Sequence, residues 1–213
     1  MKTELVFILD RSGSMCGLEN DTIGGFNSLL EKQKKEPGCA LVTTVLFDDK
    51  YEVLHDRVDL DYVVPITAAD YYVRGCTALL DAMGMTIQRI SGAQKKDRLE
   101  ERPEKTLFVI TTDGMGNASR EYDCAQIRQM VERAEREQGW EFLFLGANID
   151  AVSVADQVGI CADRAVTCSA DSAGTRVNYD TISAAASCIR ASRPLAKEWK
   201  ADIERYVRER QRR

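Results

Sequence analysis

The sequence is poor in histidine and in closely paired cysteines. It has a single histidine, His55, and seven cysteines, no two of which have C-x-x-C spacing. Zinc sites are built from closely spaced Cys and His ligands, so we expect no zinc site of that kind. The odd number of cysteines favours reduced thiols over a disulfide framework, and we expect most of them to be small buried residues. No motif singles out one cysteine as a catalytic nucleophile.

An excess of positive charge and long apolar runs are missing as well. The formal net charge is −5, which argues against general nucleic-acid binding because such proteins present a basic face. No apolar run is long enough to span a membrane. The first residues do not resemble a signal peptide, since a short apolar run follows them and is interrupted at Asp10. The expected location is therefore the cytoplasm.

Apolar segments of strand length alternate along the chain with amphipathic segments of helix length. Strands are predicted at residues 4–9, 39–47, 51–55, 106–111, 140–145 and 165–167. Helices are predicted at residues 18–35, 77–90, 120–138, 149–158 and 181–191, and a last helix follows Pro194 and continues to residue 213. A polar turn at residues 48–50 predicts a hairpin, so the third strand should run antiparallel to the second. The alternation predicts an α/β fold with a mainly parallel sheet and helices on both faces.

Oxygen-bearing side chains follow three of the predicted elements. Asp10, Ser12 and Ser14 alternate after the first strand, Thr77 stands at a helix start, and Asp113 comes just after the fourth strand. Ligands of parallel sheets bind at the carboxyl ends of the strands, where these loops can converge. Two carboxylates and three hydroxyls suit Mg²⁺ or Mn²⁺, whereas Ca²⁺ usually attracts more carboxylates. The simpler alternative is that Asp10 or a serine caps the helix that follows.

These three segments resemble a known metal site. D-R-S-G-S at residues 10–14, G-C-T at 75–77 and T-D-G at 112–114 are similar to the metal-ion-dependent adhesion site (MIDAS) of the von Willebrand factor A (VWA) family. The resemblance implies a Rossmann-like, doubly wound sheet of six strands in the order 3-2-1-4-5-6, with the third strand antiparallel. It also implies that Ser12, Ser14 and Thr77 contact the ion, while Asp10 and Asp113 act largely through water and hydrogen bonds.

The resemblance also implies a function. VWA domains with a MIDAS bind proteins without catalysis, and an Asp or Glu carboxylate of the partner takes the open coordination position. The chain looks like the intracellular bacterial type of the family. We therefore expect an unidentified protein partner that presents Asp or Glu, and no nucleic acid, membrane or small-molecule substrate.

Two other functions remain open at this stage. A Mg²⁺-dependent phosphohydrolase also places an aspartate after the first strand, but such enzymes use D-x-D, and here the second position is Ser12. The other alternative is a scaffold with the VWA fold and no functional metal site. A nucleotide site is weaker, because the glycine-rich residues 113–117 contain no recognised nucleotide-binding motif.

The end of the chain predicts a separate amphipathic helix. We divide the sequence into a VWA-like domain at residues 1–192 and a C-terminal helix at residues 193–213, packed on the domain or extending from it. Its apolar side chains recur at three- and four-residue spacing: Leu195, Trp199, Ile203, Tyr206 and Val207. Such a stripe either docks on the domain's own surface or contacts a partner.

Overall fold

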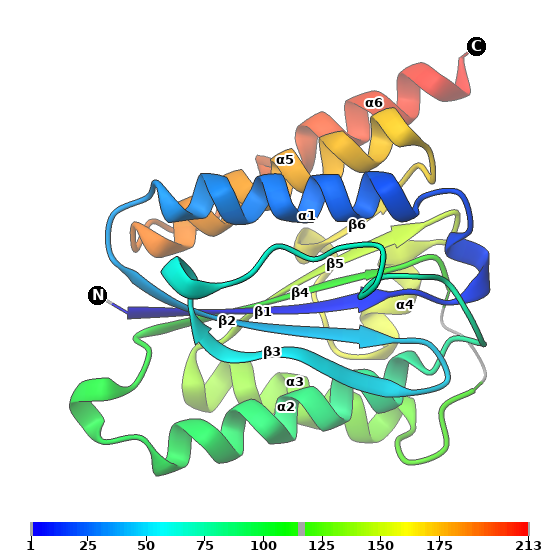
Figure 1. The fold of residues 1–213 in the computed structure, drawn as a ribbon. Coiled ribbons are helices and arrows are strands. Elements are labelled where there is room, and N and C mark those ends of the chain that lie inside the picture. The colour runs from blue at the N-terminus through cyan, green and yellow to red at the C-terminus, as the bar shows by residue number, and fades with distance from the viewer. Residues whose placement is uncertain (1, 115–117, 213) are drawn as a thin grey trace.

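Within residues 2–114 and 118–212, which the computed structural model describes, six strands form one sheet with helices on both faces (Figure 1). The strands are β1 (Lys2–Asp10), β2 (Cys39–Phe47), β3 (Tyr51–Asp59), β4 (Lys105–Thr112), β5 (Glu141–Ala147) and β6 (Ala165–Cys168). The α-helices are α1 (Glu19–Lys34), α2 (Leu79–Lys96), α3 (Cys124–Gln138), α4 (Ala151–Gln157), α5 (Ser172–Arg190) and α6 (Ala201–Gln211).

The strand order is β3-β2-β1-β4-β5-β6, with β3 antiparallel to β2 and all other neighbours parallel. The predicted six-stranded, mainly parallel α/β sheet is therefore confirmed. The hairpin forms where expected, because the N–H of Asp48 donates to the carbonyl oxygen of Lys50 at 3.1 Å. The five parallel strands end at the same edge of the sheet, which we call the carboxyl edge.

Two hydrophobic layers lie on opposite faces of the sheet. Successive strand residues point to opposite faces, so the apolar run of β1 supplies both layers. Phe7 packs with Phe26 of α1 on the face that α5 and α6 also cover. Ile8 lies in the layer beneath α2, α3 and α4, together with Met83 and Ile127 (Figure 1). Burial on both faces explains why β1 reads as a continuous apolar segment.

Three helices begin four or more residues from their predicted start. One is α6, which begins at Ala201 instead of directly after Pro194, since Lys197–Lys200 form a 3-10 helix before it. Helix α5 starts at Ser172 instead of 181, because the side chain of Asp171 caps it by accepting from the N–H of Gly174 at 2.9 Å. Its early turns are polar, yet Tyr179 is buried against α1, where Gly25 leaves room for the ring. Helix α3 starts at Cys124 instead of 120, because Asp123 caps it in a capping box with Gln126 and the N–H groups of residues 120–122 bind Asp81 of α2.

Strand β3 is also longer than predicted and continues to Asp59. The pairing of β2 with β3 is irregular between Val42 and Val45. Beside this irregularity Arg57 adopts a left-handed backbone with φ of 51°. Its guanidinium donates to the buried carboxylate of Glu4 at 2.8 Å and pairs with Asp97. The contacts of this arginine with two other elements stabilise a strand end that the sequence pattern does not mark.

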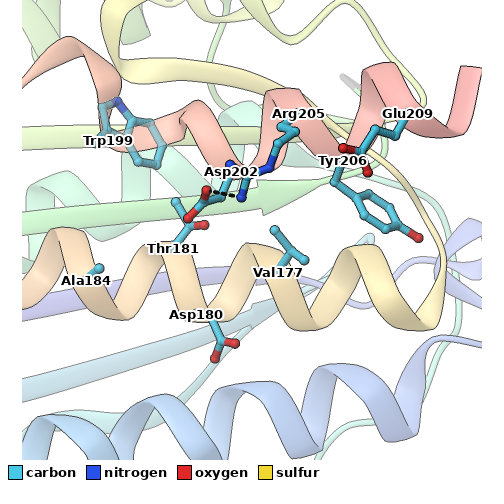
Figure 2. Close-up of a pocket in the computed structure, with 9 residues that line it drawn as sticks. All are labelled: Val177, Asp180, Thr181, Ala184, Trp199, Asp202, Arg205, Tyr206 and Glu209. Carbon is cyan, nitrogen blue, oxygen red and sulfur yellow. Dashed lines mark hydrogen bonds and ion pairs between the residues drawn. The ribbon is translucent and has the colours of Figure 1, made fainter.

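Helix α6 packs against α5 and β6. Ile203 is buried, and Trp199 and Val207 are partly buried against the same core. The indole N–H of Trp199 donates to the carbonyl oxygen of Asp163 at 2.8 Å, and the hydroxyl of Tyr206 donates to Asp171 at 2.6 Å. A groove of about 410 Å³ remains between α5 and α6, with side chains of both helices at its walls (Figure 2). Residue 213 of the predicted helix lies outside the described residues.

No helix among the described residues is both long and apolar enough to span a lipid bilayer.

Candidate metal centre

Backbone hydrogen bonds bring two of the predicted metal loops together at the carboxyl edge. The loop after β1 receives support from both sides, because the N–H of Arg11 donates to Phe47 O at 2.8 Å and the N–H of Arg74 donates to Arg11 O at 2.9 Å. The N–H of Gly13 donates to Gly75 O at 3.2 Å. Gly75 has a φ of 64°, and a Cβ there would lie 2.2 Å from an oxygen of Asp49. Glycine at this position therefore allows the loop before α2 to approach the hairpin.

Asp10 is buried at the end of β1 and is fixed by its neighbours. Its carboxylate accepts from the N–H of Ser12 at 2.7 Å and from the hydroxyl of Thr112 at 2.6 Å. The hydroxyl of Tyr71 donates to the backbone carbonyl of Asp10 at 2.5 Å. Burial raises the pKa of the Asp10 carboxyl, and the hydrogen bonds from Thr112 and Ser12 oppose that rise. The hydrogen bonds from Ser12 and Thr112 therefore fix the orientation of the Asp10 carboxylate.

A chain of polar contacts links three further predicted ligands. The hydroxyl of Ser14 donates to Asp113 Oδ1 at 2.7 Å, and the Oγ atoms of Ser12 and Ser14 are 3.2 Å apart. Ser12 is buried, Ser14 is exposed and Asp113 is half-buried. The structure thus brings Asp10, Ser12, Ser14 and Asp113 into one contiguous group that solvent reaches at Ser14.

Thr77 lies in the loop that contacts the loop of this group. It is buried two residues before α2 begins, in the segment that contacts Gly13. The N–H of Ala118 donates to the carbonyl oxygen of Thr77 at 3.3 Å, which links this loop to the chain that follows Asp113. Residues 115–117 of the glycine-rich segment lie outside the described residues.

The donor set is one of hydroxyls and isolated carboxylates. Among residues 2–114 and 118–212, no three His, Cys, Asp or Glu side chains are grouped so that they could hold a metal. The candidate set differs in kind, since three of its five donors are hydroxyl oxygens. Cis ligands of an octahedral ion with bonds of about 2.1 Å lie ~3.0 Å apart, close to the 3.2 Å between the hydroxyls of Ser12 and Ser14. The residues present therefore fit a small divalent cation.

An ion-pair cluster next to the loop after β1 was not predicted from the sequence. Arg11 is fully buried, and its Nε donates to Asp48 at 3.1 Å while its Nη2 pairs with Glu52. Arg74 donates to the same Asp48 oxygen at 2.6 Å, and both guanidinium groups lie over the ring of Tyr72. Burial raises the pKa of Asp48, but the hydrogen bonds from Arg74 and Lys50 and the charge of Arg11 bring it below its ordinary value.

The burial of Asp48 is the part of this cluster that the turn pattern does not show. The sequence places Asp48 in a polar turn, and the structure keeps it in that turn but buries it completely. Two arginines in the sequence could have indicated that an acidic side chain is buried here. Arg11 lies within the D-x-S-x-S segment, and Arg74 directly precedes G-C-T. Two arginine cations beside the candidate metal site need anionic partners of their own, and Asp48 and Glu52 supply them.

The expectation that most cysteines are buried is wrong. All seven are free thiols, and only Cys168 is fully buried. Burial raises the pKa of Cys168 to about 12. The exposed cysteines are Cys16, Cys39, Cys76 and Cys161. They lie in loops or at element ends, where a small apolar side chain has no core to enter.

Comparison with known proteins identifies the fold. Neither a protein-family model nor a curated protein sequence matches the chain. Solved structures do: a von Willebrand factor type A protein from Catenulispora acidiphila aligns over 87% of this chain and 42% of its own, with a TM-score of 0.57 and 14% identity. This chain has the VWA fold.

Two other solved structures extend the comparison. The vWF domain of the type V pili tip protein Mfa5 from Porphyromonas gingivalis covers 91% of this chain and 97% of its own, with a TM-score of 0.65 and 10% identity. Proximal thread matrix protein 1 from the mussel byssus, with a zinc-occupied MIDAS motif, covers 87% and 46%, with a TM-score of 0.58 and 14% identity. This chain thus spans less than half the length of the Catenulispora and mussel proteins. Identities this low show the fold alone.

Proposed function

We propose that this chain is a non-catalytic, metal-dependent protein-binding domain. In this proposal Asp10, Ser12, Ser14, Thr77 and Asp113 hold Mg²⁺ or Mn²⁺, and an Asp or Glu side chain of a partner protein completes the coordination. The observation that supports it most is the contiguous group of carboxylates and hydroxyls at the carboxyl edge of a VWA fold.

The chemistry of this group supports an acidic partner. Hydroxyl oxygens carry no formal charge. If Ser12, Ser14 and Thr77 bind the divalent cation directly and the two aspartates act through water, the directly bound ligands leave the ion electron-poor, and it attracts an anionic ligand. When bound, the ion supplies an electrophilic centre for a carboxylate. Ser14 is exposed, so a partner can approach the group from solvent.

The proposed location is the cytoplasm, as for an intracellular bacterial VWA protein. The free state of all seven cysteines supports a reducing compartment. The mussel protein carries zinc in its MIDAS motif, which supports a divalent metal in this fold, and the hard oxygen donors of this chain favour Mg²⁺ or Mn²⁺ over zinc.

Thermal unfolding with and without metal tests the proposal. A cation that binds the native loops and not the unfolded chain stabilises the protein by about 2.7 kcal/mol at 100 times its Kd. For a chain of this size we expect Mg²⁺ or Mn²⁺ to raise the Tm by roughly 5–10 °C over the value in EDTA. The variant Asp113→Ala should stay folded and lose this shift, because it lacks the carboxylate that contacts Ser14.

Asp150→Ala is the matched control, since Asp150 only caps α4. It should keep the full metal response. If neither Mg²⁺ nor Mn²⁺ changes the Tm of the wild-type protein, the proposed function is contradicted. If Asp113→Ala shows the wild-type metal response, Asp113 is not part of the site. The same proteins serve as bait: a partner should be retained by the wild type in Mg²⁺ and released by EDTA.

A further inference from the structure

Asp81 connects two loops of the candidate site. It lies in the first turn of α2, four residues after Thr77. One carboxylate oxygen accepts from the N–H of Arg120 at 2.8 Å, and the other accepts from the N–H groups of Glu121 and Tyr122 at 2.9 and 3.0 Å. A single side chain therefore binds three successive backbone donors of the segment that follows Asp113.

The same segment caps α2 in return. The first N–H groups of a helix need acceptors from outside the helix, and the residue before α2 is Ala78, whose side chain cannot accept. The hydroxyl of Ser119 takes this role, accepting from the N–H of Leu80 at 3.1 Å and more weakly from that of Asp81 at 3.4 Å. The N–H of Ala118 also donates to the carbonyl oxygen of Thr77, so each of the two segments both donates hydrogen bonds to the other and accepts them from it. We call residues 118–122 and 77–81 together the α2 clasp.

An apolar contact closes the clasp on its far side. The ring of Tyr122 lies against Gly84 of α2, where a Cβ would meet ring atoms at 2.6 Å. The close approach needs glycine at that position. The segment is therefore fixed on α2 by its backbone, by a hydroxyl and by an aromatic ring.

We propose that Asp81 is a positioning residue for the metal site, setting the Thr77 loop at the correct distance from the Asp113 loop. Thr77 ends one side of the clasp, and Ala118 comes five residues after Asp113 on the other. One turn of α2 thus holds the Thr77 loop against the chain that follows Asp113. Asp81 contributes to metal affinity by orienting ligands rather than by touching the ion. The inference rests on the proposed function.

The test is Mn²⁺ binding to the full chain, followed by electron paramagnetic resonance of free Mn²⁺ at 25 °C. Removal of groups that orient metal ligands typically weakens affinity 10–100-fold, so Asp81→Ala should raise the Kd at least about tenfold. Asp81→Asn should give a smaller rise, since its amide oxygen can still accept from Glu121 and Tyr122 while its NH₂ group faces the N–H of Arg120. Circular dichroism in EDTA establishes that each variant is folded at the temperature of the titration.

Asp123→Ala is the matched control. Asp123 also accepts a backbone N–H at a helix start, from Gln126 at 2.8 Å, but it joins no two loops of the site. Its loss should lower the Tm and leave the Kd unchanged. If Asp81→Ala does not fold, the Kd of Asp81→Asn decides the question.

The outcomes separate the two proposals. A wild-type protein that binds no Mn²⁺ would overturn the proposed function and this inference with it. Wild-type binding with an unchanged Kd in the folded Asp81 variant would overturn the inference alone. An equal rise of the Kd in the Asp81 and Asp123 variants would do the same, because it would indicate general loosening.

Discussion

His55 is a buried imidazole and the only histidine of the chain. Its Nδ1 lies 3.0 Å from the hydroxyl of Thr44 on the neighbouring strand. Burial lowers the pKa of His55 below its ordinary value of 6.5, because desolvation disfavours the charged ring. Protonation of His55 is therefore less favourable in the native state than in the unfolded state.

This residue predicts a pH dependence of stability. As the pH falls below about 6.5, the unfolded chain binds a proton at His55 before the native chain does, so the free energy of unfolding decreases. The decrease continues until the pH reaches the lowered native pKa. Denaturant unfolding between pH 7.5 and 5.5 should show this slope in the wild type and a smaller slope in His55→Gln.

Proton NMR of the imidazole ring measures the pKa of His55 independently, because the chain has a single histidine. Its proton resonance should titrate below pH 6.5 in the native protein. A midpoint at or above 6.5, or equal slopes for the wild type and His55→Gln, would show that the ring is not desolvated as the structure places it.

Helix α6 illustrates how one element gains stability from polar and apolar contacts together. Its buried Ile203 enters the core, and Lys200 at its start donates to the carbonyl oxygens of Ala162 and Ala165, both at 2.7 Å. Arg210 near its end pairs with Asp171 at 2.9 Å. Trp199 and Tyr206 lie at the two ends of the groove that Figure 2 shows.

Trp199→Ala tests the energetic role of this helix. The indole is partly buried and makes one hydrogen bond, so its removal should cost roughly 2 kcal/mol of unfolding free energy. That loss corresponds to a fall in Tm of about 4–8 °C for a protein of this length. Differential scanning calorimetry in EDTA measures it without a contribution from metal.

Two variants separate the causes. Trp199→Phe keeps most of the apolar contact and loses the N–H that binds Asp163, so it should lose less stability. Tyr62→Ala removes an aromatic ring that is 79% exposed and should leave the Tm nearly unchanged. An unchanged Tm in Trp199→Ala, with weaker binding of a captured partner, would instead assign the helix to the partner.

For the molecule as a whole, we expect binding without turnover. The position that would carry the catalytic acid of a D-x-D phosphohydrolase is Ser12, and His55 lies within β3 rather than at the carboxyl edge. A phosphate monoester assay with Mg²⁺ or Mn²⁺ should therefore give no rate above background. Metal-dependent hydrolysis that disappears in Asp10→Asn would instead favour the phosphohydrolase alternative.

The resemblance to the VWA family implied the strand order, and the sequence by itself determined the strands, the hairpin and the loops of the candidate site. These features depend on local patterns: an apolar run buried on both faces makes β1, the polar residues at 48–50 make the turn, and Asp10, Ser12 and Ser14 follow a strand end. Strands that alternate with helices run parallel, so their carboxyl ends share an edge. The placement of Asp113 beside Ser14 follows from that topology.

Only the tertiary structure decided which polar residues are buried and how the loops are tied together. Asp48 reads as a turn residue until Arg11 and Arg74 converge on it from other loops. Asp81 reads as an ordinary residue of a first helical turn until the chain after Asp113 returns to it, about 40 positions later. The early turns of α5 likewise carry no continuous apolar pattern, and Tyr179 within them is buried where Gly25 of α1 leaves room for its ring. Contacts between positions so distant in sequence leave no local periodicity, because the burial and the charge partners of each residue are set by packing between elements.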